Sequence, residues 1–283
     1  NKTGVLLTGI SGAMKTKYEQ IILDLNGVVL NDENYATMDK KQDEEQVRFK
    51  YIVTPKLVRS EKLIVGIIQK KKIVKMEFLD SCKKAQKWLP SEPFCWMNDA
   101  EIIKHIPSDG TEMTVSVKNG GNEKLKAKVD LIQAMRVWQT KSIEQNRFYG
   151  KNVFIWLPST TIKTYYKVLA ALGASVFSIQ SYEDVDGSIE ECLKQCRAIP
   201  NKIDEVYLCN DDEIKNAAKS RGESDKKKAF RSLMKKLTAI CQFWSKEKKL
   251  KCYDLDFIVD WTLEAAVFKD SDISMEQYSY SIR

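Results

Sequence analysis

The chain has 283 residues, of which 43% are hydrophobic and 30% are charged, and its formal net charge is +7. This length predicts two domains with a linker rather than one small core. The charged fraction, and the lack of any apolar run near the roughly 18 residues that span a bilayer, argue against a membrane protein. Lysine runs such as 70–72 and 226–228 indicate either a solvated surface or weak attraction to DNA, chromatin or an anionic peptide.

The first part of the chain alternates short apolar runs with amphipathic segments. Between residues 15 and 25 the apolar residues recur at helical spacing, and Asn26-Gly27 is typical of a left-handed helix end. Ser60 is a suitable N-cap for the helix that follows it. The predicted elements are strands at 5–7, 28–30, 51–53 and 73–74, with helices at 15–25, 60–69 and 76–86. Such alternation predicts a parallel sheet covered on both faces.

The same pattern recurs after residue 150. We expect strands at 153–156, 175–178, 205–208 and 250–253, with helices from Thr160 or Thr161 to Leu172, at 228–244 and at 255–267. The polar, lysine-rich stretch 211–228 is expected to be a mobile loop. Between the two parts, residues 114–121 suggest a small hairpin. Residues 124–142 predict a linker helix, whose apolar stripe can either pack on its own domains or serve a partner.

An internal repeat organises these elements. Residues 73–80 align with residues 252–259, and each segment is a short strand that runs into a helix with an aromatic residue near its start. Two copies of one α/β unit follow from this. We expect a first domain at 1–97, a linker at 98–149 and a second domain at 150–283.

At this point the sequence resembles the BRCT family, and specifically its tandem-repeat members. The landmarks, in order, are Thr8-Gly9, Asn26-Gly27, 51–55, 59–62, 73–81 and 88–94. The resemblance implies two BRCT-like α/β domains packed in tandem, each with a small parallel four-stranded sheet flanked by helices. The family's tryptophan in its last helix is replaced here by Phe78 and, in the second unit, by Phe257. Both keep an aromatic core residue, and Trp261 can share the role of Phe257.

The resemblance also implies a phosphate pocket in the first unit. The Thr8 hydroxyl, the Gly9 N–H and the Lys62 ammonium match the family's phosphate-binding groups, with Ser60 adding a hydroxyl or supporting the site. These donors suit an anion, and glycine lets the backbone approach it. Arg59 resembles the family arginine that contacts the ligand three residues beyond the phosphoresidue, where it suits a carbonyl or a carboxylate.

The matching place in the second unit reads Trp156-Leu157-Pro158, without a hydroxyl-glycine pair. We therefore expect the second unit not to bind phosphate.

The expected function is a phosphopeptide-binding scaffold module of the DNA damage response in the nucleus. The resemblance implies a phosphorylated protein as ligand, such as the damage-phosphorylated histone C-terminal tail, and other repair proteins as partners. The alternatives are a phosphate-independent protein-interaction module or a weak DNA and chromatin binder.

Enzymatic chemistry is not indicated. His105 is the single histidine, and neither GxxxxGK[ST] nor GxGxxG after a strand occurs. The seven cysteines have scattered spacing and no CxxC pair, which argues against a disulfide framework or a zinc site and suggests a reducing compartment. We expect no enzyme activity, no metal and no cofactor.

Overall fold

The computed structural model describes residues 2–31, 35, 47–104, 121–156, 162–178, 188–199, 202–219, 226–264 and 279. The chain divides into two compact units: one is Asn1–Ser142 with Thr262–Lys269, and the other is Ile143–Trp261 with Asp270–Arg283. The domain boundaries given above stay predictions. The expected hairpin lies outside the described residues except for Gly121, which begins a helix, and His105 lies outside them too.

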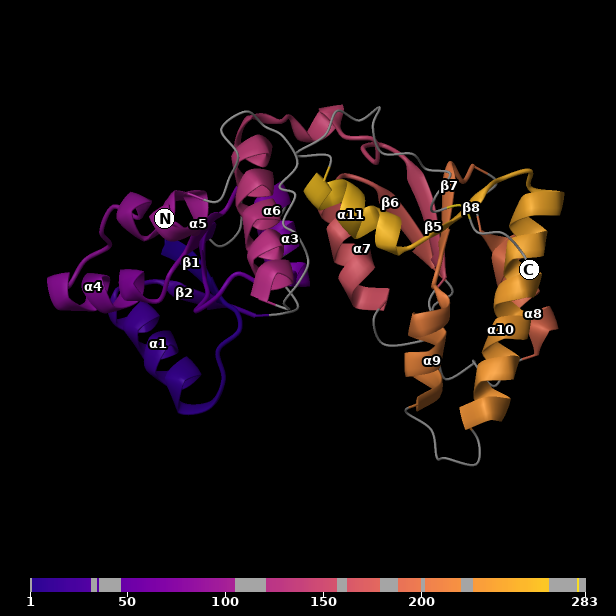
Figure 1. Ribbon diagram of the computed structural model, residues 1–283, viewed down its shortest axis with the longest axis horizontal. Coiled ribbons are helices and arrows are strands. Elements are labelled where there is room, and N and C mark those ends of the chain that lie inside the picture. Colours follow the sequence, from indigo (N-terminus) through magenta and orange to yellow (C-terminus); the bar gives the residue numbers. More distant parts are fainter. Residues whose placement is uncertain are drawn as a thin grey trace. The chain divides into compact units, whose positions relative to one another are not determined.

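The first unit holds one parallel sheet with the strand order β2-β1-β3-β4, which confirms the predicted α/β class (Figure 1). Its strands are β1 (Lys2–Leu7), β2 (Val28–Leu30), β3 (Val47–Val53) and β4 (Lys72–Val74). Its helices are α1 (Gly12–Asp24), α3 (Glu61–Ile68), α4 (Glu77–Ala85), α5 (Ala100–Ile103) and α6 (Gly121–Thr140), with short turns η2 (Glu92–Phe94) and η3 (Trp96–Asn98). The left-handed residue at the end of α1 is Asn26, with φ of 57°.

The two faces of this sheet bury alternate residues of each strand. Val5 and Tyr51 belong to the core that α1 and α4 cover, and Phe78 is fully buried there, with its ring 4.8 Å from that of Tyr51. Ile52, the next residue in β3, meets α3 at Gly66, where an added Cβ would lie 2.1 Å from its Cδ1 atom. Glycine therefore lets α3 lie this close to the sheet with the Ile52 side chain in its present position, which a larger residue would displace.

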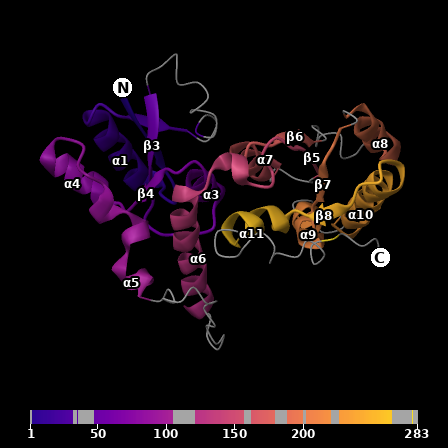
Figure 2. The same ribbon diagram turned by 90° about the horizontal axis from the view of Figure 1, so that it is seen from above.

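Helix α6 is the predicted linker helix, and it packs against α3, η3 and α5 within the first unit (Figure 2). Its apolar stripe is buried at Val129, Ile132, Met135 and Trp138. The Trp138 Nε1–H donates to the Thr262 carbonyl oxygen over 3.0 Å. The described part of this stripe therefore serves the protein's own packing.

The second unit repeats the topology of the first. Its parallel sheet has the strand order β6-β5-β7-β8, with β5 (Asn152–Trp156), β6 (Ser175–Ser178), β7 (Glu205–Leu208) and β8 (Cys252–Asp254). Its helices are α7 (Ile162–Ala171), α8 (Ile189–Ala198), α9 (Asp211–Lys219), α10 (Lys226–Gln242) and α11 (Asp256–Glu264), with short segments η4 (Ile143–Gln145) and η6 (Phe243–Glu247). Each sheet thus ends in a strand that leads into an aromatic-bearing helix, as the internal repeat predicts.

Aromatic packing fills the core of the second unit. Phe257 is fully buried and stacks on Tyr207, with ring centroids 6.1 Å apart. Trp261 packs edge-on against Phe148 at 5.2 Å. Phe257 therefore takes the core position that Phe78 takes in the first unit, and Trp261 shares it.

The expectation of a mobile loop over 211–228 is wrong for residues 211–219 and 226–228, whereas residues 220–225 lie outside the described part of the chain. The structure places α9 over Asp211–Lys219 and starts α10 at Lys226. Within the polar sequence of α9, Ile214 and Ala218 are four residues apart and are only 0% and 4% exposed. Helix α9 packs against α10, so a narrow apolar face is enough to hold it in tertiary contact even though its composition is polar.

Candidate phosphate-binding site

The carboxyl ends of β1 and β3 bring two threonines to one edge of the first sheet. The Thr8 N–H donates to the Val53 carbonyl oxygen, and the Thr54 N–H donates to the Val74 carbonyl oxygen, each over 3.1 Å. Thr8 and Thr54 are only 9% and 1% exposed. Because all strands of the sheet are parallel, the residues that follow β1 and β3 lie side by side at this edge.

Gly9 makes the turn out of β1. Its φ of +69° is a left-handed conformation that side-chain-bearing residues rarely adopt. An added Cβ would lie 3.6 Å from both Thr54 Oγ1 and Pro55 Cδ, which is ordinary contact. Backbone conformation rather than crowding therefore calls for glycine here, and the same turn leaves this residue exposed.

Thr54 stiffens the loop that leads from β3 toward α3. Its Oγ1 hydroxyl donates to the Lys56 carbonyl oxygen over 2.8 Å, and its own carbonyl oxygen accepts from Trp96 Nε1–H over 3.2 Å. Sequence reasoning missed this threonine. The signal was present in Thr54-Pro55 directly after a strand, since a threonine hydroxyl commonly bonds to nearby backbone in turns.

Ser60 takes the predicted N-cap position of α3, with φ of −129° and ψ of 150°. Its carbonyl oxygen accepts the first helical hydrogen bond, from the Ile64 N–H, over 3.0 Å. Its side chain makes no capping bond, and the buried Oγ atom has no hydrogen-bond partner among the described residues. A buried hydroxyl without a hydrogen-bond partner costs about 1–3 kcal/mol of folding free energy. The Ser60 hydroxyl lies at the N-terminus of α3, where the first N–H groups of a helix also lack partners within the helix.

Lys62 lies in the first turn of α3 and is partly exposed. Residues 54–60 connect the carboxyl end of β3 to this turn. The neighbouring Glu61 is also in the first turn, and its carboxylate accepts a hydrogen bond from the hydroxyl of the fully buried Tyr35. An acidic residue at this end is compatible with the helix dipole, and the tyrosine satisfies part of its charge.

Arg59 is bound by the linker helix. Its Nη2 atom lies 3.3 Å from Asp130 Oδ2, and the two side chains are 38% and 19% exposed. The guanidinium therefore already meets one carboxylate in the first unit. Nothing in the sequence signals this pairing, because the two residues belong to segments that only the tertiary structure brings together.

The corresponding edge of the second sheet carries carboxylates. Asn210 Nδ2 donates to Asp256 Oδ2 over 2.8 Å, and the Asp256 N–H donates to Asp254 Oδ1 over 3.0 Å. Burial, followed by repulsion from Asp256 and Asp260, raises the pKa of Asp254 to about 6. Burial and the charges of Asp260 and Asp212 also raise the pKa of Asp256. This edge is negative and partly desolvated, which opposes binding of a phosphate.

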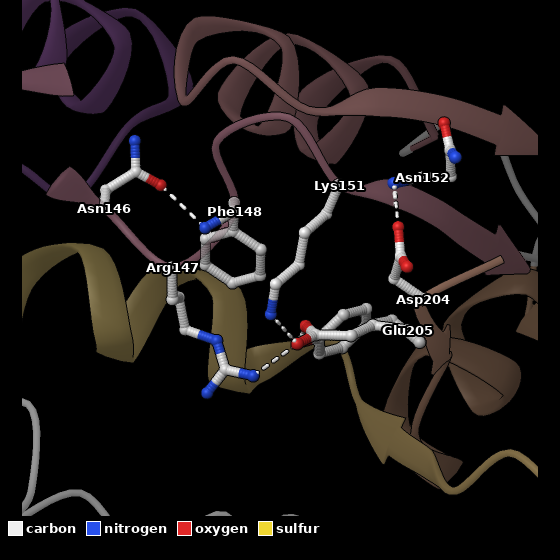
Figure 3. A network of polar contacts seen from close by, with 8 residues as sticks. Asn146, Arg147, Phe148, Lys151, Asn152, Asp204 and Glu205 are labelled. Carbon is white, nitrogen blue, oxygen red and sulfur yellow. Dashed lines mark hydrogen bonds and ion pairs between the residues drawn. The ribbon is translucent and has the colours of Figure 1, made fainter. Parts of the chain in front are cut away.

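The opposite, amino edge of the second sheet holds an ion-pair network (Figure 3). Glu205 is 8% exposed and lies 2.6 Å from Arg147 Nη2 and 2.5 Å from Lys151 Nζ, and the Tyr207 hydroxyl donates to it over 2.6 Å. Burial by itself raises the pKa of a carboxyl group. The hydrogen bonds from Lys151 and Tyr207 and the positive charge of Arg147 outweigh that effect, so the pKa of this carboxyl group lies below its ordinary value.

Residues next to the ion-pair network make further contacts that hold it in place. Arg147 also lies over the ring of Phe257, 4.9 Å from its centroid, and Asn146 Oδ1 accepts from the Phe148 N–H over 2.8 Å. The network therefore ties the chain before β5 to β7 and α11, and its groups are engaged with one another. Its geometry is that of a structural element of the second unit.

All seven cysteines are buried and none of them forms a disulfide, and burial raises the pKa of Cys196 to about 12. Within the described ranges, no three His, Cys, Asp or Glu side chains are grouped so that they could hold a metal. In that same part of the chain, no helix combines the length and apolarity that crossing a membrane requires.

Fold and repeat together define a tandem of two α/β units, each with a parallel sheet of strand order 2-1-3-4. Solved structures similar to this chain are tandem BRCT domains. The S. pombe Brc1 BRCT5-BRCT6 domains are 12% identical, with a TM-score of 0.43 over 82% of this chain and 93% of theirs. S. pombe Rad4 BRCT3,4 is 7% identical, with a TM-score of 0.27 over 99% of this chain and 98% of its own.

A third structure, the S. pombe Nbs1 FHA/BRCT-repeat domain, is 10% identical, with a TM-score of 0.30 over 83% of this chain and 64% of its own. No protein-family model matches the sequence, and no curated protein matches it either. The repeated α/β fold is defined by this chain's own strand order and register.

Proposed function

We propose that the chain is a phosphopeptide-binding module, and that the first unit holds the phosphate. Thr8 and Gly9 would supply a hydroxyl and a backbone N–H, Lys62 would supply the charge, and Ser60 would add or support a donor. The observation that carries the proposal is the buried Ser60 hydroxyl, which lacks a hydrogen-bond partner at the N-terminus of α3. A phosphate at this helix end would gain from the N–H groups and from the helix dipole.

The left-handed turn at Gly9 supports the same site. It follows β1 at the sheet edge from which the loop to α3 also departs. A phosphoserine or phosphothreonine carries close to two negative charges and three strong acceptor oxygens at neutral pH. Phosphorylation of the ligand would then switch binding on.

The proposal extends to the ligand and its setting. We place the chain in the nucleus as a scaffold module of the DNA damage response, with no catalytic role of its own. Its ligand is a phosphorylated Ser/Thr tail such as the damage-phosphorylated histone C-terminal tail, and other repair proteins are partners. Arg59 would meet the ligand's terminal carboxylate, because a guanidinium binds carboxylates in a bidentate geometry.

Fluorescence polarisation with matched phosphorylated and unphosphorylated tail peptides tests the proposal. We expect the phosphopeptide to bind and Lys62→Ala to weaken it by about 10- to 100-fold, since a hydrogen bond to a charged group contributes about 1.5–3 kcal/mol. Thr8→Val removes the hydroxyl at nearly constant shape and should weaken binding by about ten-fold or less.

Lys84→Ala is the matched control, because this exposed lysine lies on α4, outside the proposed pocket. It should leave the affinity unchanged. Equal affinity for the two peptides, or an undiminished affinity of the Lys62→Ala protein, would remove the proposal.

A further inference from the structure

The second unit carries a helix that its sheet does not need. In the first unit, residues 54–71 connect β3 to β4 through α3 alone, and all of these residues are described. In the second unit, residues 209–251 connect β7 to β8 and hold α9, α10 and η6. Both connections complete the same strand order. The additional helix therefore needs an explanation other than closing the sheet.

Helices α9 and α10 lie beside each other (Figure 1). Their side chains line a shallow, open pocket of about 330 Å³. Ala218, which is buried, and Phe230, which is half-buried, give the pocket an apolar lining. The other lining residues are all cationic: Lys215, Lys219, Lys226, Lys227 and Arg231. This volume lies at the lower end of the range of about 300–1,000 Å³ that is typical of ligand pockets.

The charge around the pocket is one-sided. Helix α10 contains six lysines and arginines and no acidic residue. Lys227 and Arg231 are exposed and four residues apart, so they repel each other along one helix face. Such a like-charge pair costs a helix about 0.2–0.5 kcal/mol.

Helix α9 repeats the arrangement with Lys215 and Lys219. Asp212 pairs with Lys215 over 2.9 Å, but both side chains are largely exposed, and exposed pairs contribute little. The surface around the pocket is therefore complementary to a negatively charged ligand.

We propose that this pocket, the α9–α10 pocket, binds an acidic peptide segment of a partner protein and takes up one of its bulky apolar side chains. Acidic side chains would meet the surrounding cations, and a leucine or an aromatic ring would fill the space beside Phe230. The apolar lining favours a peptide over duplex DNA, whose outer surface is a phosphate backbone without an apolar group to insert. The inference concerns a site separate from the proposed phosphate pocket and does not depend on it.

Fluorescence polarisation on the full chain tests the proposal with three labelled probes. They are a short peptide of aspartate and glutamate with interspersed leucines, the same peptide with serine in place of leucine, and a duplex DNA. We expect the leucine peptide to bind at least about ten-fold more tightly than the serine peptide, because only leucine can fill the pocket. Phe230→Ser should remove most of that difference.

Charge-reversal variants locate the site. Lys227→Glu with Arg231→Glu should lower the affinity for the leucine peptide by at least about ten-fold. The matched control is Lys228→Glu with Lys235→Glu, which changes the charge of the same helix equally at exposed positions that do not line the pocket. It should cost less than about three-fold.

Both double variants should keep their affinity for the phosphorylated tail peptide. Three results would each overturn the proposal. The two double variants could lose the same affinity, or the leucine and serine peptides could bind equally. The third is that DNA binds more tightly than the leucine peptide and that Phe230→Ser does not change its affinity. The last result would assign the surface to nucleic acid.

Discussion

The carboxyl edges of the two sheets have the same architecture and opposite chemistry. In the first unit, Thr8, Gly9 and the start of α3 present hydroxyls, N–H groups and a lysine. In the second unit, Asp254 and Asp256 occupy the same edge, and burial together with neighbouring carboxylates such as Asp260 raises the pKa of both. The strand order is identical, so the two edges differ in the side chains that follow each strand and not in the backbone fold.

The comparison also separates two uses of charge. The second unit pairs the buried carboxylate of Glu205 with two cations at the amino edge. The first unit has its candidate binding groups at the carboxyl edge. Variants at the two edges separate a role in stability from a role in binding.

Removing the buried charge at the amino edge should have the largest effect. Glu205→Gln leaves Arg147 and Lys151 without their shared carboxylate, and we expect a loss of about 2–4 kcal/mol in the free energy of unfolding. Because the folded-state pKa of Glu205 is depressed, its contribution is present above about pH 4 and is lost as the pH falls further. Urea denaturation at several pH values measures both effects.

The exposed Glu247 serves as the control for this variant, since Glu247→Gln should leave stability unchanged. A loss for Glu205→Gln no larger than that of Glu247→Gln would show that the ion pairs contribute nothing to the second unit.

Reversing one charge should make the first edge resemble the second. We expect Lys62→Glu to lower the phosphopeptide affinity by at least about 100-fold, because it removes an attractive group and adds repulsion next to Glu61. Isothermal titration calorimetry measures this change. Lys84→Glu carries the same charge change on α4 and should have little effect, so similar losses in both variants would mean long-range attraction rather than a local pocket.

Neutralising the second edge should stabilise the protein. Asp254→Asn keeps an oxygen that can accept from the Asp256 N–H, and it removes a half-buried charge. The folded-state pKa of Asp254, about 6, lies above the ordinary value near 3.9, so the folded state binds more protons between these values and loses stability as the pH rises through this window.

We expect a gain of about 1 kcal/mol at pH 7.5, reduced from the full shift because the group is partly solvated, and a flatter pH dependence between about pH 4 and 6. Thermal melts across this range measure it. Asp212→Asn is the control, since pairing with Lys215 lowers the pKa of this exposed carboxyl group. A destabilised Asp254→Asn protein would show that the charge is favourable where it lies.

The smallest effect concerns the arginine that α6 binds. Asp130→Asn releases Arg59, and we expect a cost in stability below about 1 kcal/mol because the pair is partly exposed. We also expect about two- to three-fold tighter binding of a phosphopeptide with a free terminal carboxylate, but not of its amidated form. Weaker binding of both peptides would instead mean that Asp130 holds Arg59 in a productive position.

Local sequence patterns predicted most elements well. The strands at Val28–Leu30, Ser175–Ser178 and Glu205–Leu208 have the predicted bounds, because each is a short apolar or β-branched run next to a clear turn. Helix α9 was missed, because its apolar face is only Ile214 and Ala218, and packing against α10 stabilises it. The pairing of Arg59 with Asp130 could not be predicted, because it joins residues 71 positions apart.

The sequence alone predicted the repeated α/β unit and the parallel sheets, because these depend on periodicity and turn chemistry along the chain. Motif order along the chain suggested the candidate phosphate-binding residues, which stay a prediction. Tertiary structure alone decided which charged groups meet. It joined Arg147 and Lys151 to Glu205, gathered Asp254 and Asp256 at one edge and left the Ser60 hydroxyl buried at a helix end. Burial and proximity in space set these energies, and neither is written in local sequence.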